Sequence, residues 1–149
     1  AVRQAHALRR AWDLGALVFY DPHLSNVSVL GGCAALHTLK IRGTRVMDVS
    51  ALLGCSALHT LDISFTEVTD VSALAGCAVL HTLHFRNALA TDVSALASCA
   101  ALHTLELTHS RRLREVSALG SCAALQNLCL SDCPYVSDVS ALAGCAALH

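Results

Sequence analysis

A repeat of 22 or 23 residues runs through the sequence and limits what the chain can fold into. Its clearest markers are cysteines, whose successive spacings are 22, 22, 22, 23 and 23 residues. Val-Ser pairs recur with the same spacings, so two markers agree. A period of this length is typical of a solenoid, in which each unit is one turn of chain that packs on the next. The marker cysteines are Cys33, Cys55, Cys77, Cys99, Cys122 and Cys145.

Each unit places apolar residues at the same positions. Units begin near Leu14, Leu36, Leu58, Leu80, Leu102 and Leu125, and Leu148 begins one more. The segment Leu36, Leu39, Ile41, Thr44 and Val46 matches the L-x-x-L-x-L-x-x-N-x-L pattern, and later units repeat the match. The chain therefore resembles the leucine-rich repeat family. We expect one domain over residues 1–149, with about six repeats, as a fragment of a longer array.

The resemblance implies an α/β repeat solenoid: a horseshoe arc with a parallel sheet on its concave face and short 3₁₀ or irregular returns on its convex face. The short period resembles that of bacterial internalins and of a regulatory subunit of protein phosphatase 1. The Leu-His-Thr-Leu and Gly-Cys-Ala-Ala-Leu phrases are similar to repeat arrays of trypanosomatid protozoa.

The residues themselves predict the course of one unit. Leu61 and Ile63 obey the two-residue alternation of a strand, so we expect a strand of about three residues around them. Val71, Leu74 and Cys77 follow at spacings of three, which suit a 3₁₀ return. Acidic residues precede this return, and their carboxylates are expected to accept its free N–H groups. The expected capping residues are Asp48, Asp70, Asp92 and Asp138, with Asn26 and Glu115 as substitutes.

Two departures from the repeat predict local irregularity. The family's asparagine, which bonds to buried backbone between coils, is replaced by Thr44, Thr66, Ser110 and Cys133. Ala88 and Pro22 have no suitable side chain there, and Asn87 is a candidate to stand in for Ala88. The last two full units each gain one residue, between Ser110 and Glu115 and between Cys133 and Asp138, which should bulge the convex-side loops.

Composition excludes several classes. The chain is 54% hydrophobic, but charged residues recur throughout, which argues against a membrane-spanning helix. Its net charge of -1 provides no bulk basic field for nucleic acid or an anionic membrane. The first residues lack the long apolar segment of a signal peptide. No phosphate-binding glycine loop, zinc-protease motif or isolated carboxylate pair is present, so we expect no enzyme activity and no cofactor.

Repeated polar columns have structural explanations. The cysteines recur between leucines and are expected to be core thiols, because no C-x-x-C pair suggests a zinc site. Unpaired thiols favour a reducing compartment, so we expect an intracellular, cytoplasmic protein. Histidines form a column that we expect to stack as a ladder, and metal binding or pH sensing is the alternative. The histidine column contains His37, His59, His81 and His103, beside a threonine column of Thr38, Thr60, Thr82 and Thr104.

The positions beside the inward strand residues vary freely within an otherwise copied unit. By two-residue alternation their side chains point away from the core, onto the concave face. A mixture of basic, acidic and aromatic residues on a curved sheet is typical of a protein-binding face. The predicted contact residues are Tyr20, Lys40, Arg42, Asp62, Ser64, Phe65, His84, Arg86, Glu106, Thr108, His109 and Asp132.

We therefore expect a non-catalytic interaction scaffold that binds a protein partner of unknown identity on its concave face. One alternative is a structural subunit of a large cytoskeletal or ribonucleoprotein assembly, held by its edges and convex loops. Another is a regulatory or adaptor subunit of a phosphatase or ubiquitin ligase. The basic cluster of Arg111, Arg112 and Arg114 is expected to be a solvated edge, and nucleic acid is expected as a partner only within an assembly.

Overall fold

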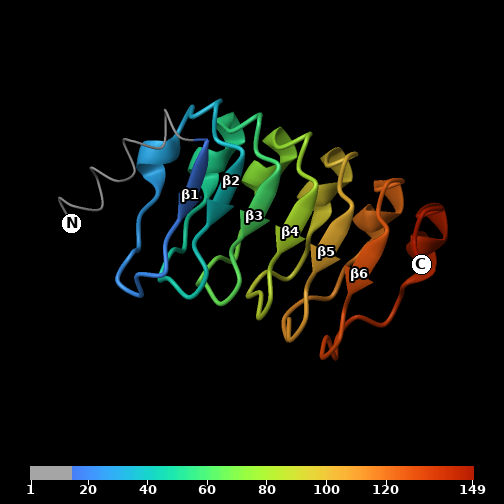
Figure 1. Ribbon diagram of the computed structural model, residues 1–149. Coiled ribbons are helices and arrows are strands. Elements are labelled where there is room, and N and C mark those ends of the chain that lie inside the picture. The colour runs from blue at the N-terminus through green and yellow to red at the C-terminus, as the bar shows by residue number, and fades with distance from the viewer. Residues whose placement is uncertain (1–14) are drawn as a thin grey trace.

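Each unit of the repeat forms one short strand and one 3₁₀ helix in the computed structural model, which describes residues 15–149. Leu14, the expected start of the first unit, lies outside the described residues. The strands form one parallel sheet in chain order, and the helices stack in a second row (Figure 1). The strands are β1 (Ala16–Val18), β2 (Thr38–Lys40), β3 (Thr60–Asp62), β4 (Thr82–His84), β5 (Thr104–Glu106) and β6 (Asn127–Cys129). The 3₁₀ helices are η1 (Ser28–Leu30), η2 (Ser50–Gly54), η3 (Ser72–Gly76), η4 (Ser94–Ser98), η5 (Ser117–Ser121) and η6 (Ser140–Gly144). This confirms the predicted solenoid.

The strands are short because only the middle residue of each points into the core. In β3, Leu61 is fully buried, whereas Thr60 and Asp62 are half-buried on the other face. Equivalent leucines of neighbouring strands pair in register, Leu39 with Leu61 and Leu61 with Leu83. Strand β3 begins at Thr60, one residue earlier than predicted. The backbone hydrogen bonds between coils continue beyond the strand, because the Ile63 N–H donates to the His84 carbonyl at 3.0 Å.

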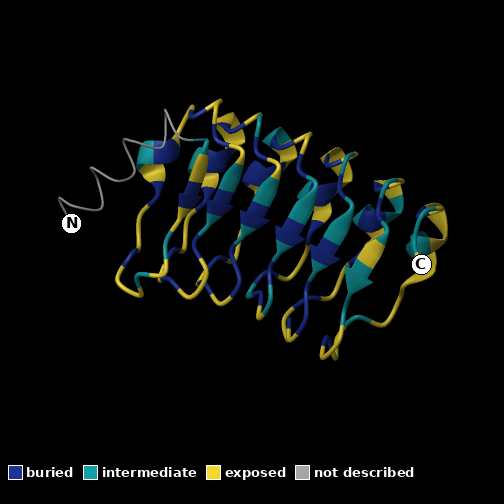
Figure 2. Cartoon of the chain, viewed as in Figure 1, coloured by how far each residue is buried: buried dark blue, intermediate teal, exposed yellow. Residues whose placement is uncertain are grey.

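The core is a continuous column of apolar side chains between the sheet and the helices. Leu58, Leu61, Ile63 and Leu74 of one unit are all fully buried. Burying such a side chain contributes about 1.5–3 kcal/mol, and here the neighbouring coils supply much of the cover. At β6 the equivalent Leu128 is only partly buried. Figure 2 shows this last strand in the colours of half-buried and exposed residues. Among the described residues, no helix has the length and apolar character needed to cross a membrane.

The predicted aspartate caps are confirmed at the start of the returns. In η3, the Asp70 carboxylate accepts the Ser72 N–H at 2.8 Å. This backbone bond, together with the Ser72 hydroxyl, lowers the pKa of Asp70 below its ordinary value. The same bond is made by Asp48, Asp92, Asp138 and Asn26.

Glu115 is the exception, because the described residues give its carboxylate no bond to the following return. Instead, its backbone forms an isolated parallel bridge with Asp92. The prediction that Glu115 substitutes as a cap is wrong. The glutamate side chain is one methylene longer than aspartate, which makes the tight turn back to the N–H less favourable.

Of the residues that replace asparagine, Ser110 and Cys133 bond to another coil as predicted, whereas Thr44 and Thr66 bond within their own turn. The Thr66 hydroxyl donates to the Ile63 carbonyl at 2.8 Å, and the Cys133 thiol donates to the Leu107 carbonyl at 3.1 Å. At Ala88 the backbone N–H donates to the Ser110 hydroxyl of the next coil at 3.2 Å. Asn87 does not stand in for Ala88: its side chain is exposed, because its backbone has a positive φ of 55° that turns it outward.

Candidate interaction surface

The concave face, meaning the solvent side of β1 to β6, carries the first varied column that the alternation predicts. Lys40, Asp62, His84 and Glu106 are half-buried there, each beside an inward leucine. Their Cα atoms are paired in strand register. These side chains are therefore held side by side across four consecutive coils.

The second column is less uniform than predicted. Tyr20 and Arg42 are exposed and Arg86 is half-buried. Ser64 and Thr108 are buried, so their side chains offer little surface to a partner. The Ser64 hydroxyl accepts the Arg86 N–H at 3.2 Å and thus serves the contact between coils. Strand alternation fails here because the chain is already entering the turn.

The third column lies on the turns at the edge of the concave face. Phe65, His109 and Asp132 all adopt a left-handed backbone, with φ of 58°, 62° and 58°. All three side chains are exposed, and His109 Nε2 lies 3.2 Å from a carboxylate oxygen of Asp132. The turn geometry, rather than strand alternation, therefore determines where these side chains point.

Glu106 organises the centre of the face. One of its carboxylate oxygens lies 2.9 Å from His84 Nδ1, and the other lies 2.7 Å from Arg86 Nε. Desolvation raises the pKa of Glu106, but the hydrogen bonds and charges of His84 and Arg86 outweigh it, and the net pKa is lowered. The three side chains form a fixed group in which the carboxylate is ionised and its charge is compensated.

The half of the face nearer β1 has a different character. The Arg42 guanidinium lies 5.2 Å from the centre of the Phe65 ring, and Tyr20 is 71% exposed. Among residues 15–149, neither Lys40 nor Arg42 has a carboxylate within 4.0 Å. The Asp62 carboxylate accepts the Ser64 N–H at 3.0 Å. Uncompensated cations beside exposed rings can therefore bind carboxylates and apolar groups of a partner.

Three of the four histidines of the predicted column, His59, His81 and His103, stack at the start of the strands, whereas His37 has no ring contact among the described residues. The His59 and His81 rings are 4.7 Å apart and those of His81 and His103 are 4.3 Å apart, nearly parallel in both pairs. Desolvation, with the charges of His103 and His59, lowers the pKa of His81. Within the described residues no group of three or more His, Cys, Asp or Glu has the arrangement of a metal site.

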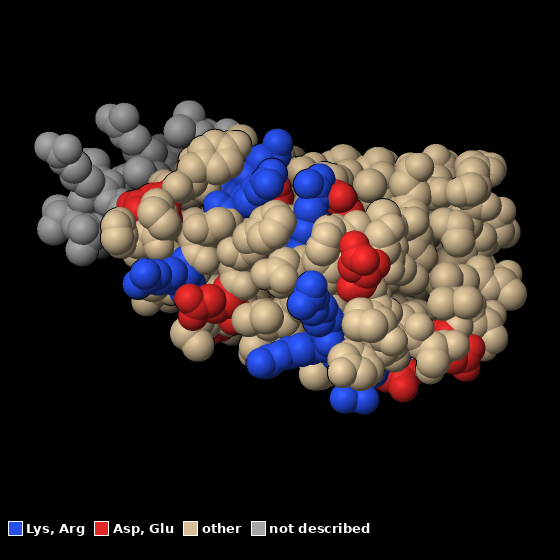
Figure 3. All heavy atoms as spheres, turned by 90° about the horizontal axis from the view of Figure 1, so that it is seen from below, with Lys and Arg blue, Asp and Glu red and all other residues tan. Residues whose placement is uncertain are grey.

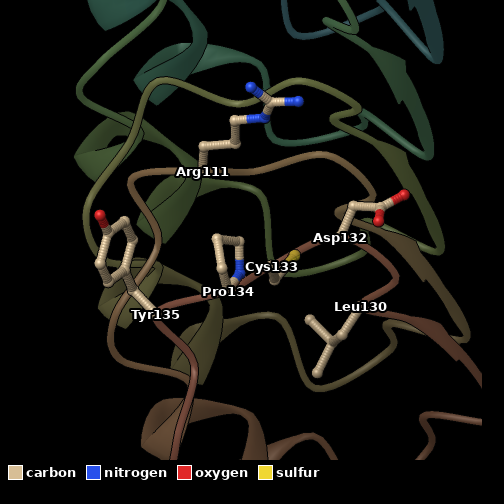
Figure 4. Close-up of a pocket in the computed structure, with 6 residues that line it drawn as sticks. All are labelled: Arg111, Leu130, Asp132, Cys133, Pro134 and Tyr135. Atoms are coloured by element: carbon tan, nitrogen blue, oxygen red, sulfur yellow. The ribbon is translucent and has the colours of Figure 1, made fainter.

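The turns that follow the strands carry a second surface that the sequence analysis missed. Of the seven lysines and arginines of residues 15–149, six lie between a strand and its return, and Lys40 ends β2. Figure 3 shows the lysines and arginines spread along this side of the molecule. Beside the last of them is an open groove of about 760 Å³. Its sequence signals were the basic cluster of Arg111, Arg112 and Arg114 and the extra residue in each of the last two full repeats, neither of which predicted a groove. The lining residues are Arg111, Leu130, Asp132, Cys133, Pro134 and Tyr135 (Figure 4).

Comparisons with known proteins support the fold. No protein-family model matched the chain, and a comparison with curated proteins gave no match either. Among solved structures, an internalin from Listeria monocytogenes, inlF, superposes with a TM-score of 0.77 and 25% identity, covering 85% of this chain and 37% of that one. Internalin C2 of the same species gives 0.75 and 19%, covering 97% of this chain and 79% of that one. The Arabidopsis receptor kinase HAESA, solved in complex with the peptide hormone IDA and the co-receptor SERK1, gives 0.73 and 21%, covering 89% and 24%.

Proposed function

We propose that this chain, whose fold is that of internalin-like leucine-rich repeat proteins, is a non-catalytic scaffold that binds a protein partner on its concave face. Leucine-rich repeat neighbours are interaction scaffolds, and HAESA is solved with a peptide hormone. The chain covers 37% of the length of the internalin inlF. The role of a longer protein that contains this chain is therefore also a proposal. The observation that carries it is the arrangement of varied charged and aromatic side chains on an otherwise copied sheet.

The geometry favours binding because the face is ordered before a partner arrives. His84 and Arg86 hold Glu106 by both oxygens, and Arg42 lies over Phe65. Side chains that are already fixed lose less conformational entropy on association. Exposed aromatic and arginine side chains are also the residue types that contribute most to binding energy in protein interfaces.

The test is affinity capture from a lysate of the source cell, read by mass spectrometry. We expect the wild-type chain to retain a specific partner that the Arg42→Glu/Arg86→Glu variant loses. Because Arg86→Glu places a second carboxylate beside Glu106, an Arg42→Ala/Arg86→Gln variant is tested in parallel. Circular dichroism confirms that each variant is folded.

A charge-matched control distinguishes the alternatives. Arg111→Glu/Arg112→Glu makes the same charge change outside the concave face and should still capture the partner that the concave-face variants lose. If the concave variants retain every partner and the control loses a large assembly, the chain is a structural subunit held by its edges. Co-purification of phosphatase or ubiquitin-ligase activity would instead identify a regulatory or adaptor subunit.

We also propose that the protein works in a reducing compartment. Cys55, Cys77 and Cys99 are buried, and each thiol donates to a leucine carbonyl of the preceding coil at 3.5 Å. A disulfide would remove these S–H donors. Acid quenching of source cells, followed by mass spectrometry of the cysteines, should find them as thiols; disulfides among these three positions would contradict the proposal.

A further inference from the structure

The two enlarged turns of the repeat lie next to each other and create a surface that the other coils lack. In a 22-residue unit one residue separates two buried positions of the turn, as Glu67 separates Thr66 and Val68. In the two 23-residue units the separation is two residues. Arg111 and Arg112 occupy the first enlarged turn, Pro134 and Tyr135 occupy the second, and all four are exposed.

Backbone hydrogen bonds close both enlarged turns; in the second, the Val136 N–H donates to the Cys133 carbonyl at 3.2 Å. Leu113 is fully buried, and its N–H donates to the Ser110 carbonyl at 3.2 Å. The next N–H, of Arg114, donates to the Thr91 carbonyl of the preceding coil at 2.9 Å. The Arg114 guanidinium lies 5.0 Å from the centre of the Tyr135 ring, which joins the two turns.

The groove described above lies between these turns (Figure 4). Leu130, Pro134 and Tyr135 supply apolar walls, and Arg111 contributes a cationic side chain. Asp132 also lines it, but its carboxylate lies 3.2 Å from His109 Nε2. The groove therefore combines apolar side chains with one arginine and one aspartate.

The charges next to the groove favour an anionic partner. Among residues 15–149, no carboxylate lies within 4.0 Å of the guanidinium groups of Arg111 and Arg112. Charge-assisted hydrogen bonds to arginine are among the stronger polar contacts, and arginine suits the planar carboxylate.

A peptide fits this surface better than a nucleic acid does. Asp132 lines the groove and Glu115 follows the arginines, so a continuous phosphate backbone would meet negative charges as well as positive ones. The net charge of the chain is -1, which gives no long-range attraction for a polyanion. A peptide with one or two carboxylates beside an apolar side chain can instead pair with Arg111 and Arg112 alone.

We propose that the groove between the enlarged turns is a second docking site, which binds an acidic linear segment of another protein. An apolar side chain of the segment enters between Leu130, Pro134 and Tyr135. Its aspartate or glutamate side chains pair with Arg111 and Arg112. The groove adjoins the concave face at Asp132, whereas its other lining residues are not among the predicted contact residues of that face.

The test begins with a random-peptide phage library selected on the wild-type chain, with counterselection on the folded Arg111→Glu/Arg112→Glu variant. Enriched peptides should combine acidic residues with an apolar one. Fluorescence anisotropy of the enriched peptide should then show binding at least about tenfold weaker to the double variant and to Tyr135→Ser. Arg45→Glu, at the equivalent turn position of an ordinary coil, should bind within about twofold of the wild type.

Two results would overturn the proposal. The first is selection that enriches no acidic peptide, or peptides that bind the wild type and the double variant equally. The second is an oligouridylate probe that binds more tightly than the selected peptide, since it would identify a nucleic-acid site. The Arg42→Glu/Arg86→Glu variant should bind the selected peptide as tightly as the wild type. The peptide-binding test is therefore independent of the concave-face proposal.

Discussion

At the scale of single residues, the left-handed turn after each strand places most of the exposed edge side chains. Phe65, Asn87, His109 and Asp132 all have positive φ, a conformation that costs a residue with a Cβ about 1–2 kcal/mol. The turn persists at Phe65, Asn87 and His109 because the N–H of each donates to a carbonyl of the next coil; for Asn87 the acceptor is the Thr108 carbonyl at 2.8 Å. Neighbouring coils therefore fix a backbone that the residue alone would disfavour.

Asn87 gives a direct test of this strain. Asn87→Val should lower the free energy of unfolding by about 1–2 kcal/mol relative to Asn87→Gly, because a β-branched side chain resists positive φ and glycine does not. Urea denaturation followed by circular dichroism measures the difference. Equal stability of the two variants would show that the turn does not have the left-handed backbone in solution.

The histidine stack predicts a pH dependence of stability. His81 has a pKa below its ordinary 6.5 in the folded chain, so the unfolded chain binds more protons in the window between the lowered value and 6.5. Stability is therefore lost as the pH falls through that window. The groups that face His81 are His59 and His103.

His81→Gln should reduce this loss, and glutamine already occupies the equivalent position at Gln126. Urea midpoints compared between about pH 7.5 and about pH 5.5 measure it. The exposed His23 lies outside the column, so His23→Gln should keep the wild-type dependence. If His81→Gln keeps it too, the stack does not contribute to acid sensitivity.

At the scale of elements, the strand and the 3₁₀ return are held mainly by the coils beside them. The Leu61 column pairs in register through the sheet, and the buried thiols donate to carbonyls of the preceding coil. Desolvation, with the charges of Cys99 and Cys55, raises the pKa of Cys77 to about 12, so its thiol stays protonated and available as a donor. Each element therefore has a stability that depends on its place in the stack.

Truncation of equivalent leucines tests this dependence. Leu61→Ala should cost about 2–5 kcal/mol, since Leu61 is fully buried and coils on both sides fix the cavity. Leu128→Ala should cost less, because the same position in β6 is only partly buried. Chemical denaturation of both variants gives the comparison, and a larger loss for Leu128→Ala would contradict the stacking argument.

At the scale of the whole molecule, the solenoid presents two surfaces of different composition. The concave face presents an ordered group around Glu106, whereas the turns next to it carry the arginines and the groove. The aspartate caps lie at the start of the returns, at a different part of each coil. Because every coil repeats the same path, residues 22 or 23 apart in sequence become neighbours on one surface.

The same architecture predicts that one repeat cannot fold alone. A synthetic peptide of residues 58–79 should show no defined structure by circular dichroism and NMR, because its leucines have no neighbouring coil to cover them. The full chain, measured under the same conditions, provides the folded reference. A peptide with native-like chemical shifts would mean that local preference, rather than stacking, stabilises the unit.

The sequence by itself determined the repeat and the capped returns, and its resemblance to leucine-rich repeat proteins implied the parallel sheet. The repeat and the returns follow from periodic positions: Leu61 must face the core in every unit, and Asp70 is close enough in sequence to accept the Ser72 N–H. Local spacing and burial are enough to predict them, since each coil copies the last.

Only the tertiary structure decided which side chains meet across coils. Alternation placed Ser64 and Thr108 on the concave face, but both are buried because the chain turns there. The contacts of Glu106 with His84 and of Arg114 with Tyr135 depend on rotamers and on the exact path of the turns. The groove beside the enlarged turns exists because two single-residue insertions, 23 residues apart, are stacked next to each other. Sequence spacing fixes the order of the coils, whereas packing between them fixes the surface.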